Sequence, residues 1–379
     1  MTEASPDREA AVGQPPLGAA SEDRSLGLDP LAGSRAERSR PDLDVLCAGR
    51  VFLDIIFTGL PSPPAVGTEV WAEGMGSCPG GAANMAVALS RLGLRTALAS
   101  PFGADVYGDF CWQVLEEQEG IDLSPSRRFP GWHSPVTISM AYERDRALVT
   151  HGHPWPTAPD DVIGTPRTCR AVVTSLGEQR EEWPSRARRD GALVFADVGW
   201  DPSEAWSEQL VRRLDEVDAF LPNAIEAMSY TRTSTPDKAL VALGSAVRLA
   251  VVTLGADGAI AVDAGTGETA RVPALPVDSL DPTGAGDVFT AGFVTGTLAE
   301  WPLELRLHFA ALCAGLSVRH FGGSLSAPGW ADIVAWWTGL GETDRELSER
   351  YGFLHDVMPE GTYRAVARAP ATIGLRPRR

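Results

Sequence analysis

The 379-residue chain has few cysteines, no long apolar run and a shortage of basic residues. Its five cysteines are odd in number and lack metal-ligand spacing, which argues against a disulfide framework or a zinc site. No run reaches the length of a membrane span, and the N-terminus carries acids where a signal segment would be apolar. These absences predict a soluble protein of the reducing cytoplasm, with no membrane partner.

The charge balance further limits the classes of partner that we expect the protein to bind. Lysines and arginines number 33 against 50 aspartates and glutamates, a formal net charge of −17. Such a balance argues against a general binding surface for nucleic acid, although it leaves room for a local basic site. With 44% hydrophobic residues, the chain is long enough for one large domain or two ordinary ones.

Composition divides the chain into three parts. Residues 1–40 are rich in Ala, Pro, Ser, Gly, Asp and Arg without periodicity, which predicts a disordered leader. In residues 41–328, short β-rich runs such as "TALAS", "AVVTSL", "ALVFADV" and "LAVVTLG" alternate with helical stretches. This alternation predicts an α/β domain with a doubly wound, mainly parallel sheet. Residues 329–379 change character again and are predicted to be a C-terminal extension.

A proline-rich piece interrupts the alternation early in the domain. The stretch "LPSPPAVGTEVWAEGM" mixes prolines with a short alternating pattern, which favours strand over helix. We therefore expect a small β-lid over about residues 60–76.

The stretch "DPTGAGDVFTAGF", Asp281–Phe293, combines glycines with an acid at the start of an apolar helical segment. Gly284 and Gly286 permit a turn whose N–H groups point into open space, where they can hold an anion. Asp287 follows at the mouth of the helix, where the macrodipole favours negative charge and the carboxylate can accept a proton. The stretch is typical of an anion cradle with an adjacent base.

A second glycine-rich turn lies in "GSCPGGAANMAVALSRLG". Gly80 and Gly81 would let a ligand approach the backbone, and Asn84 in the first helical turn can both donate and accept. A plain capped turn explains the same residues equally well. Asp54, an acid inside the apolar run "GRVFLDIIF", indicates either a solvent-facing strand or an acceptor for ligand hydroxyls.

Two weaker patterns follow later in the chain. Asn223 and Glu226 in "LPNAIEAMSY" have the spacing of a helix capping box, and Glu226 could equally help to hold a hydrated Mg²⁺. Gly255 and Gly258 in "VVTLGADGAIAVD" fit a hairpin turn or a ligand site beyond a parallel strand. The spacing does not separate the two alternatives for Asn223 and Glu226, whereas the local pattern at Gly255 and Gly258 favours the hairpin turn.

Together these motifs resemble the ribokinase-like, or PfkB, family of carbohydrate and nucleoside kinases. "GGAAN" is similar to the family's N-terminal signature and "DPTGAGDVFTAGF" to its C-terminal signature, and the resemblance runs from about Leu43 to Pro328 in the family's order. It implies transfer of the γ-phosphoryl of ATP to a hydroxyl of a sugar-like small molecule. It also implies Mg²⁺, a candidate monovalent cation near Asp281 and Ser324, and a candidate homodimer formed through the lid.

The resemblance also implies individual roles. Asp287 would be the catalytic base, and the backbone N–H groups of Gly284, Ala285 and Gly286 would stabilise the transferring phosphoryl. The implied substrate-binding residues are Asp54, Gly80, Gly81 and Asn84. The implied nucleotide-binding and metal residues are Asn223, Thr253, Gly255, Gly258 and, for Mg²⁺ and phosphates, Glu226.

Three departures from the family pattern concern the ligands. Phe52 stands where ribokinases have an asparagine two residues before Asp54, which admits an aromatic or less polar contact. Arg50 could meet a phosphate or carboxylate of the substrate, or form a surface salt bridge. Residues 318–323 replace the family's usual Thr-Arg-x-Gly-Ala ending. A sugar or sugar-acid kinase, a nucleoside kinase and a catalytically silent binding protein therefore stay open.

Overall fold

The computed structural model describes residues 41, 43–142, 145–164, 167–177, 180–199, 204–340, 344–359, 363, 365–366 and 368. The expected disordered leader, residues 1–40, lies outside the described residues.

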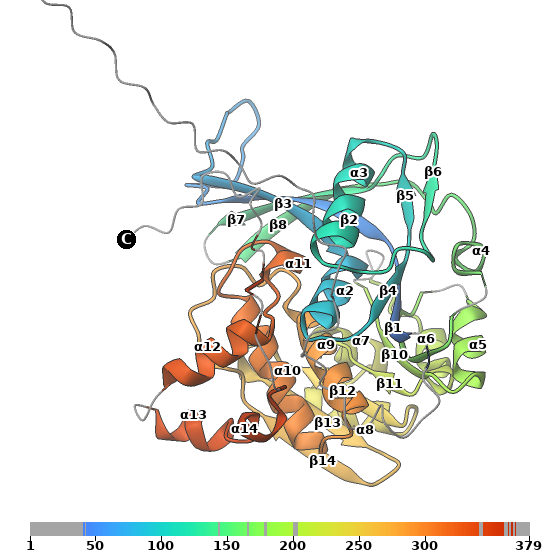
Figure 1. Ribbon diagram of the computed structural model, residues 1–379, viewed down its shortest axis with the longest axis vertical. Helices are drawn as coiled ribbons and strands as arrows, with labels where there is room; N and C mark the ends of the chain where they lie inside the picture. The colour runs from blue at the N-terminus through green and yellow to red at the C-terminus, as the bar shows by residue number, and fades with distance from the viewer. Residues whose placement is uncertain are drawn as a thin grey trace, which may run out of the picture.

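Eight strands form the main sheet, in the order β14-β13-β12-β11-β10-β9-β1-β4 (Figure 1). The strands from β4 to β12 pair in parallel, whereas β13 and β14 close one side as antiparallel hairpins. Their bounds are β1 (Leu43–Ala48), β4 (Thr96–Ala99), β9 (Cys169–Ser175), β10 (Leu193–Asp197), β11 (Ala219–Phe220), β12 (Leu249–Thr253), β13 (Ala259–Asp263) and β14 (Glu268–Val272).

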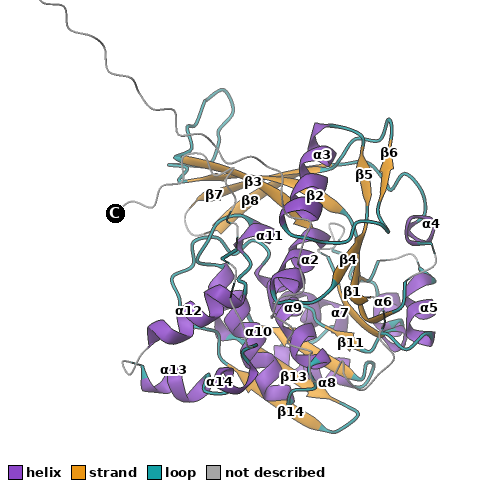
Figure 2. Cartoon of the chain, in the orientation of Figure 1, coloured by secondary structure: helices purple, strands orange, loops and turns teal. Residues whose placement is uncertain are grey.

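Helices cover both faces of this sheet (Figure 2). Successive strand residues point to opposite faces, so Val251 packs into one hydrophobic core and its neighbours Ala250 and Val252 into the other. The first core is covered by α2 (Ala82–Arg91), α9 (Ala285–Leu298) and α10 (Leu303–Ser317). The second is covered by α5 (Trp183–Arg189), α6 (Glu208–Arg212), α7 (Ala224–Thr231) and α8 (Pro236–Gly244). The predicted doubly wound α/β sheet is confirmed.

The lid is a separate four-stranded sheet, larger than the sequence predicted. It has the order β3-β2-β7-β8, with β2 (Val51–Thr58), β3 (Gly74–Gly81), β7 (Val136–Tyr142) and β8 (Asp145–His151). Of the predicted stretch 60–76, only the part from Gly74 is strand, and residues 59–73 are the loop that joins β2 to β3. Three prolines in that loop, at positions 61, 63 and 64, lack the N–H that a strand ladder needs. The bounds predicted for the lid were therefore wrong.

Smaller elements complete the chain. They are β5 (Pro101–Gly103), β6 (Arg127–Phe129), α3 (Val106–Gln113), the π-helix η1 (Val114–Gln118), α4 (Pro159–Ile163), and the 3₁₀ turns η2 (Leu214–Glu216) and η3 (Gly255–Asp257). Near the C-terminus lie α11 (Gly323–Ser326), α12 (Trp330–Leu340), α13 (Arg345–Arg350) and α14 (Leu354–Val357).

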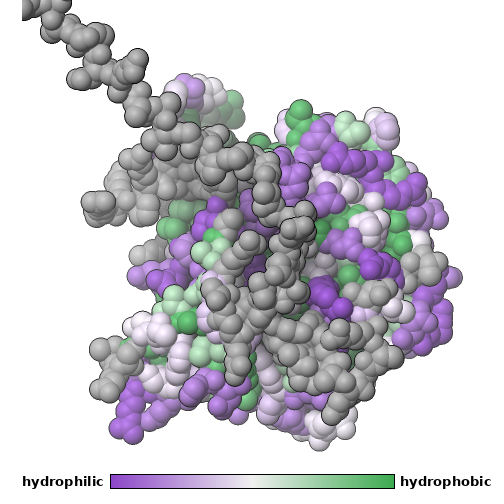
Figure 3. Space-filling view, in the orientation of Figure 1, coloured by the Kyte–Doolittle hydropathy of each residue, from purple (hydrophilic) through white to green (hydrophobic). Residues whose placement is uncertain are grey.

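The segment predicted as a C-terminal extension is packed into the domain as far as α14. Trp330 and Tyr351 are almost fully buried in the core shared with α9 and α10. The indole Nε1 of Trp330 donates to the Leu92 carbonyl at 2.9 Å. On the face shown in Figure 3, hydrophilic side chains gather over α13 and α5 at the rim. Among the described residues, no helix combines the length and apolarity that a membrane crossing requires.

Candidate active site

The candidate site lies at the carboxyl edge of the main sheet. Strands β9, β10 and β12 end at Ser175, Asp197 and Thr253, and Asn223 lies three residues after the end of β11. Because these strands are parallel, their carboxyl ends share one edge, where ligands of doubly wound sheets bind. Asn223 and Thr253 form a parallel bridge, so two predicted nucleotide-binding residues are neighbours.

The N-terminus of α9 forms the predicted turn. Gly284 is the residue before the helix and has a φ of 76°, a left-handed conformation that favours glycine. A Cβ on Gly286 would meet no heavy atom within 4 Å. The Ala285 N–H donates to the Pro282 carbonyl at 3.2 Å, whereas no partner is found among the described residues for the N–H of Gly284 or Gly286. Two of the three predicted amides are thus available to an anion.

Tertiary packing brings the two glycine-rich motifs together. Asn84 Nδ2 donates to Asp287 Oδ2 at 2.8 Å, although the two residues are 203 positions apart. A Cβ on Gly284 would lie 3.3 Å from the Asn84 amide, so glycine permits this close approach. Asn84 is buried, and its Oδ1 has no hydrogen-bond partner among the described residues. An unmatched buried acceptor beside a carboxylate is suited to a ligand hydroxyl.

The lid presents a row of polar side chains. Asp54 on β2 is in register with Cys78 on β3 and with Thr137 on β7, which is in turn in register with Thr150 on β8. Residues in register share a face, and the Thr137 and Thr150 hydroxyls are 3.1 Å apart. A Cβ on Gly80 would overlap the Asp54 carboxylate, so the glycine makes room for the acid.

This face of the lid is directed towards the main domain. Ile56 and Cys78, which share it with Asp54, pack against Leu325 of α11. Sequence reasoning missed Thr137 and Thr150 because they belong to a hairpin far along the chain, and the only signal was a threonine in each β-rich run.

At Asn223 and Glu226, and at Gly255 and Gly258, the structural alternatives that the sequence left open are both present. Asn223 Oδ1 accepts from the Glu226 N–H at 3.0 Å, and Glu226 Oε2 accepts from the Asn223 N–H at 2.9 Å, which makes a complete capping box. Burial raises the pKa of Glu226, opposed by the Asn223 backbone hydrogen bond. Gly255 lies in the turn that joins the antiparallel strands β12 and β13. A Cβ on Gly258 would overlap the Val272 carbonyl, so close packing alone explains why glycine stands at this position.

Asp197 is a further acid that the sequence analysis did not single out. Burial, followed by the charge of Asp287, raises its pKa to about 8, and Glu226 adds to the shift. Its Oδ1 is buried and has no hydrogen-bond partner among the described residues. The only signal was an aspartate at the end of the run "ALVFADV". The charges of both Asp287 and Glu226 therefore act on the Asp197 carboxyl.

These carboxylates fit a magnesium ion bound together with phosphates. Within the described residues, no three His, Cys, Asp or Glu side chains are placed to hold a metal by themselves. Mg²⁺ commonly uses only one or two protein carboxylates, with waters and substrate phosphates as the other ligands. The orphaned oxygen of Asp197, whose pKa the charge of Glu226 helps to raise, meets that requirement.

The residues expected near a monovalent cation have protein partners. Asp281 Oδ1 accepts from the Thr283 N–H at 2.9 Å, and Asp281 Oδ2 accepts from the Gly322 N–H at 3.3 Å. The Ser324 hydroxyl donates to the Pro79 carbonyl. These bonds tie α9, α11 and β3 together, and cation binding there stays a prediction.

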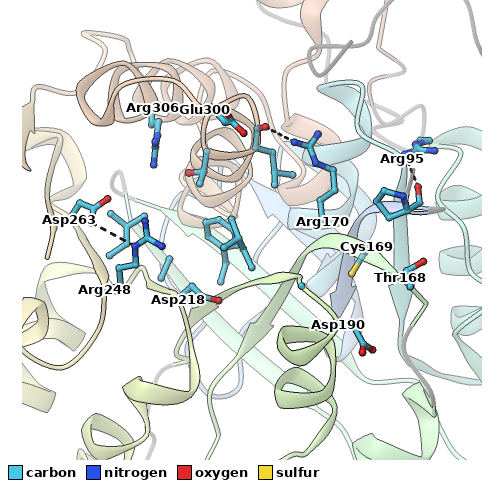
Figure 4. Close-up of a pocket in the computed structure, with 18 residues that line it drawn as sticks. Arg95, Thr168, Cys169, Arg170, Asp190, Asp218, Arg248, Asp263, Glu300 and Arg306 are labelled. Atoms are coloured by element: carbon cyan, nitrogen blue, oxygen red, sulfur yellow. Dashed lines mark hydrogen bonds and ion pairs between the residues drawn. The ribbon is translucent and has the colours of Figure 1, made fainter. Parts of the chain in front are cut away.

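A cavity of about 870 Å³ lies elsewhere (Figure 4). Its lining includes the first residues of β9, β10, β11 and β12, so it opens at the amino edge of the sheet, away from Asp287. Its charged side chains are largely matched: Arg248 lies 3.9 Å from Asp263, and Arg170 donates to the Leu298 carbonyl. The volume of this cavity therefore does not indicate where the active site lies.

The fold and the carboxyl-edge residues define an α/β small-molecule-binding protein with a β-lid. The family model for pfkB family carbohydrate kinases matches residues 45–154 and 172–330. The chain belongs to this family, as its two signatures indicated.

Curated relatives of the chain are kinases. A nucleoside kinase of Methanothermobacter thermautotrophicus is 28% identical over 77% of this chain and 95% of its own length. A 5-dehydro-2-deoxygluconokinase of Geobacillus kaustophilus is 24% identical over 77% of this chain and 92% of its own length. The solved Arabidopsis thaliana ribokinase with ribose and ATP has the same fold, with a TM-score of 0.64 and 21% identity over 77% of this chain and 98% of that one.

Proposed function

We propose that this protein transfers the γ-phosphoryl of ATP to a hydroxyl of a sugar-like small molecule. The observation that carries the proposal is the contact between Asn84 and Asp287 at the start of α9. It places a carboxylate, a buried unmatched amide oxygen and two available backbone N–H groups at one point.

In this mechanism Asp287 accepts the proton of the acceptor hydroxyl as its oxygen attacks the γ-phosphorus, while the bond from the γ-phosphorus to the bridging oxygen breaks and ADP leaves. Asn84 Nδ2 holds the Asp287 carboxylate in place, and Asn84 Oδ1 accepts from a substrate hydroxyl. The N–H groups of Gly284 and Gly286 stabilise the charge on the transferring phosphoryl, the same role that an oxyanion hole has in acyl transfer. Asp54, Thr137 and Thr150 bind the remaining hydroxyls from the lid.

The nucleotide occupies the other end of the carboxyl edge, along Asn223, Thr253 and Gly255. Glu226 and Asp197 would hold the Mg²⁺, which neutralises phosphate charge when bound. Among the described residues, no side chain caps the start of α9. The positive end of its helix dipole is therefore left to interact with the phosphates.

A substrate panel tests this function. Purified protein is given ATP and Mg²⁺ with D-ribose, D-fructose, D-gluconate, D-fructose 6-phosphate or adenosine, and both ADP and the phosphorylated product are measured. We expect a phosphorylated product from at least one sugar-like acceptor. Consumption of ATP equal to that of an acceptor-free control across the panel would contradict the proposal and favour a silent binding protein.

A nucleoside kinase is the second candidate, favoured by Phe52 and by the nucleoside kinase relative. Phe52 shares the inner face of β2 with Asp54 and lies against Gly81, where an aromatic ring can stack on a base. Turnover of adenosine well above that of every sugar in the panel would select this candidate.

The lid also supplies our proposed homodimer contact. The edge strands β3 and β8, and the loop that joins β2 to β3, expose large apolar side chains, which are Trp71, Met75, Leu148 and Val149. Patches of this kind are typical of protein interfaces. Sedimentation of the intact protein at two concentrations should show a dimer, and a monomer at both would contradict this contact.

A further inference from the structure

Arg50 is a cation on the lid that the proposed mechanism does not use. It lies directly before β2 and is half-buried. Burial lowers the pKa of its guanidinium, and within the described ranges no carboxylate opposes that shift. The described part of the chain offers it no ion pair or side-chain hydrogen bond.

Two other arginines of low exposure, Arg91 and Arg368, differ from Arg50 in having carboxylate partners. Arg91 forms two hydrogen bonds with the Glu119 carboxylate, at 2.8 and 2.9 Å. Arg368 donates to Asp332 at 2.8 Å. A partly desolvated charge is unfavourable unless an opposite charge or hydrogen-bond acceptor compensates it. The positive charge of Arg50 is therefore uncompensated, and an anion bound next to it would compensate it.

The side chain of Arg50 lies on the substrate side of the lid. A Cβ on Gly152, the residue directly after β8, would lie 3.9 Å from an Arg50 terminal nitrogen. Thr150 belongs to the polar row that begins at Asp54. The guanidinium thus lies near the end of β8, two residues beyond Thr150 in that row.

The backbone of Arg50 is fixed close to the reacting end. Its carbonyl accepts from the N–H of Ala82, the first residue of α2, at 3.0 Å. Asn84, which contacts Asp287, lies in that same first turn. A Cβ on Gly81 would overlap the Arg50 carbonyl, so glycine at this position permits the junction. One small acceptor could therefore reach from Asp287 to the lid near Arg50.

We infer that the acceptor carries a negatively charged group, a phosphate or a carboxylate, and that Arg50 binds it while Asp287 faces the reacting hydroxyl. This inference rests on the proposed function, because it names the substrate class of that same site. The planar guanidinium matches both oxyanions, with paired N–H donors. It makes Arg50 a specificity-determining residue.

Binding without ATP tests the inference separately from phosphoryl transfer. Two matched pairs are used as probes: D-fructose with D-fructose 6-phosphate, and D-sorbitol with D-gluconate. We expect the full-length protein to bind at least one charged member about 10- to 100-fold more tightly than its neutral counterpart, as a charged hydrogen-bonded pair provides. Preference for the sugar phosphate identifies a phosphate, and preference for gluconate identifies a carboxylate.

Three variants assign the effect to the guanidinium. Arg50→Gln should abolish the preference for the charged member and leave binding of the neutral one unchanged, whereas Arg50→Lys should retain part of it. Arg345→Gln is the matched control, because Arg345 is a highly exposed arginine on α13. Equal binding of charged and neutral members, or a preference that survives in folded Arg50→Gln, would overturn the inference.

The two proposals can fail separately. Binding of the charged probe through Arg50 with no transfer of phosphate from ATP would contradict the proposed function and support this inference. Phosphorylation of a neutral acceptor with unchanged kcat/KM in Arg50→Gln would support the function and overturn the inference.

Discussion

The two edges of the main sheet both carry charged side chains, but they arrange them in opposite ways. At the amino edge, basic and acidic groups neutralise one another around a cavity, as Arg248 and Asp263 do. At the carboxyl edge, the acids Asp197, Glu226 and Asp287 lie near one another, and the charge of Asp287 raises the pKa of Asp197. Perturbed acids at strand ends are a better indication of chemistry than the volume of a cavity.

The substitution with the largest expected effect is Asp287→Asn, which tests the carboxyl edge directly. Asparagine keeps the shape of the side chain but cannot accept the proton, so kcat should fall by about 10²- to 10⁴-fold. α9 is preceded by Gly284 and, among the described residues, has no capping side chain, so the melting temperature should change little. Rate, ATP affinity and thermal melt are measured on one preparation. Turnover near the wild-type value would remove Asp287 from the catalytic role.

A comparison of Asn84→Ala with Asp54→Ala separates the two substrate-binding elements. Asp54 is on the lid, so its loss should raise the acceptor KM by about 10- to 100-fold, with kcat and the ATP KM nearly unchanged. Asn84 also positions Asp287 at 2.8 Å, so its loss should lower kcat as well. Steady-state kinetics with the best acceptor give both constants. An unchanged kcat in Asn84→Ala would show that the amide does not position the base.

The pH dependence of stability tests whether folding raises the pKa of Asp197 at the carboxyl edge. Burial and the charge of Asp287 raise the Asp197 pKa to about 8 in the folded protein. The folded state therefore holds the proton more tightly than the unfolded state, so this contribution to stability is present at low pH. It is lost as the pH rises towards 8.

Asp197→Asn has no such proton to lose. Its melting temperature relative to wild type, measured without nucleotide or metal, should rise steadily from pH 5 to pH 9. Asp237→Asn, an exposed acid on α8, is the control and should show a flat difference. A difference that is also flat for Asp197→Asn would mean that its carboxyl ionises normally.

The smallest effect is expected at the amino edge. The Arg248 side chain is 63% exposed, and its Nε lies 3.9 Å from Asp263 Oδ1, which makes a weak surface ion pair. Arg248→Gln should therefore change the free energy of unfolding by no more than about 0.5 kcal/mol. Its kcat/KM should stay within about twofold of wild type, because surface sites far from the chemistry act independently. A kinetic loss as large as that of Asp54→Ala would bring the amino-edge cavity into the mechanism.

Local sequence determined the features that depend on neighbouring residues. Alternation of β-rich runs with helical stretches specified a doubly wound sheet, because strand and helix periodicity are properties of short segments. The glycines at 284 and 286 specified an open turn ahead of α9, since φ near 76° favours glycine. The capping box of Asn223 and Glu226 was equally visible, because its hydrogen bonds span only three residues.

Only the tertiary structure decided what those local features contact. The bond between Asn84 and Asp287 joins residues 203 positions apart, and no spacing rule reaches that far. The lid needs strands from two distant hairpins, and only their register puts Thr137 beside Asp54 and Arg50 near Gly152. A slip of one residue would turn each side chain to the opposite face. Local propensity thus selects the elements, while packing and register decide which polar groups meet in the site.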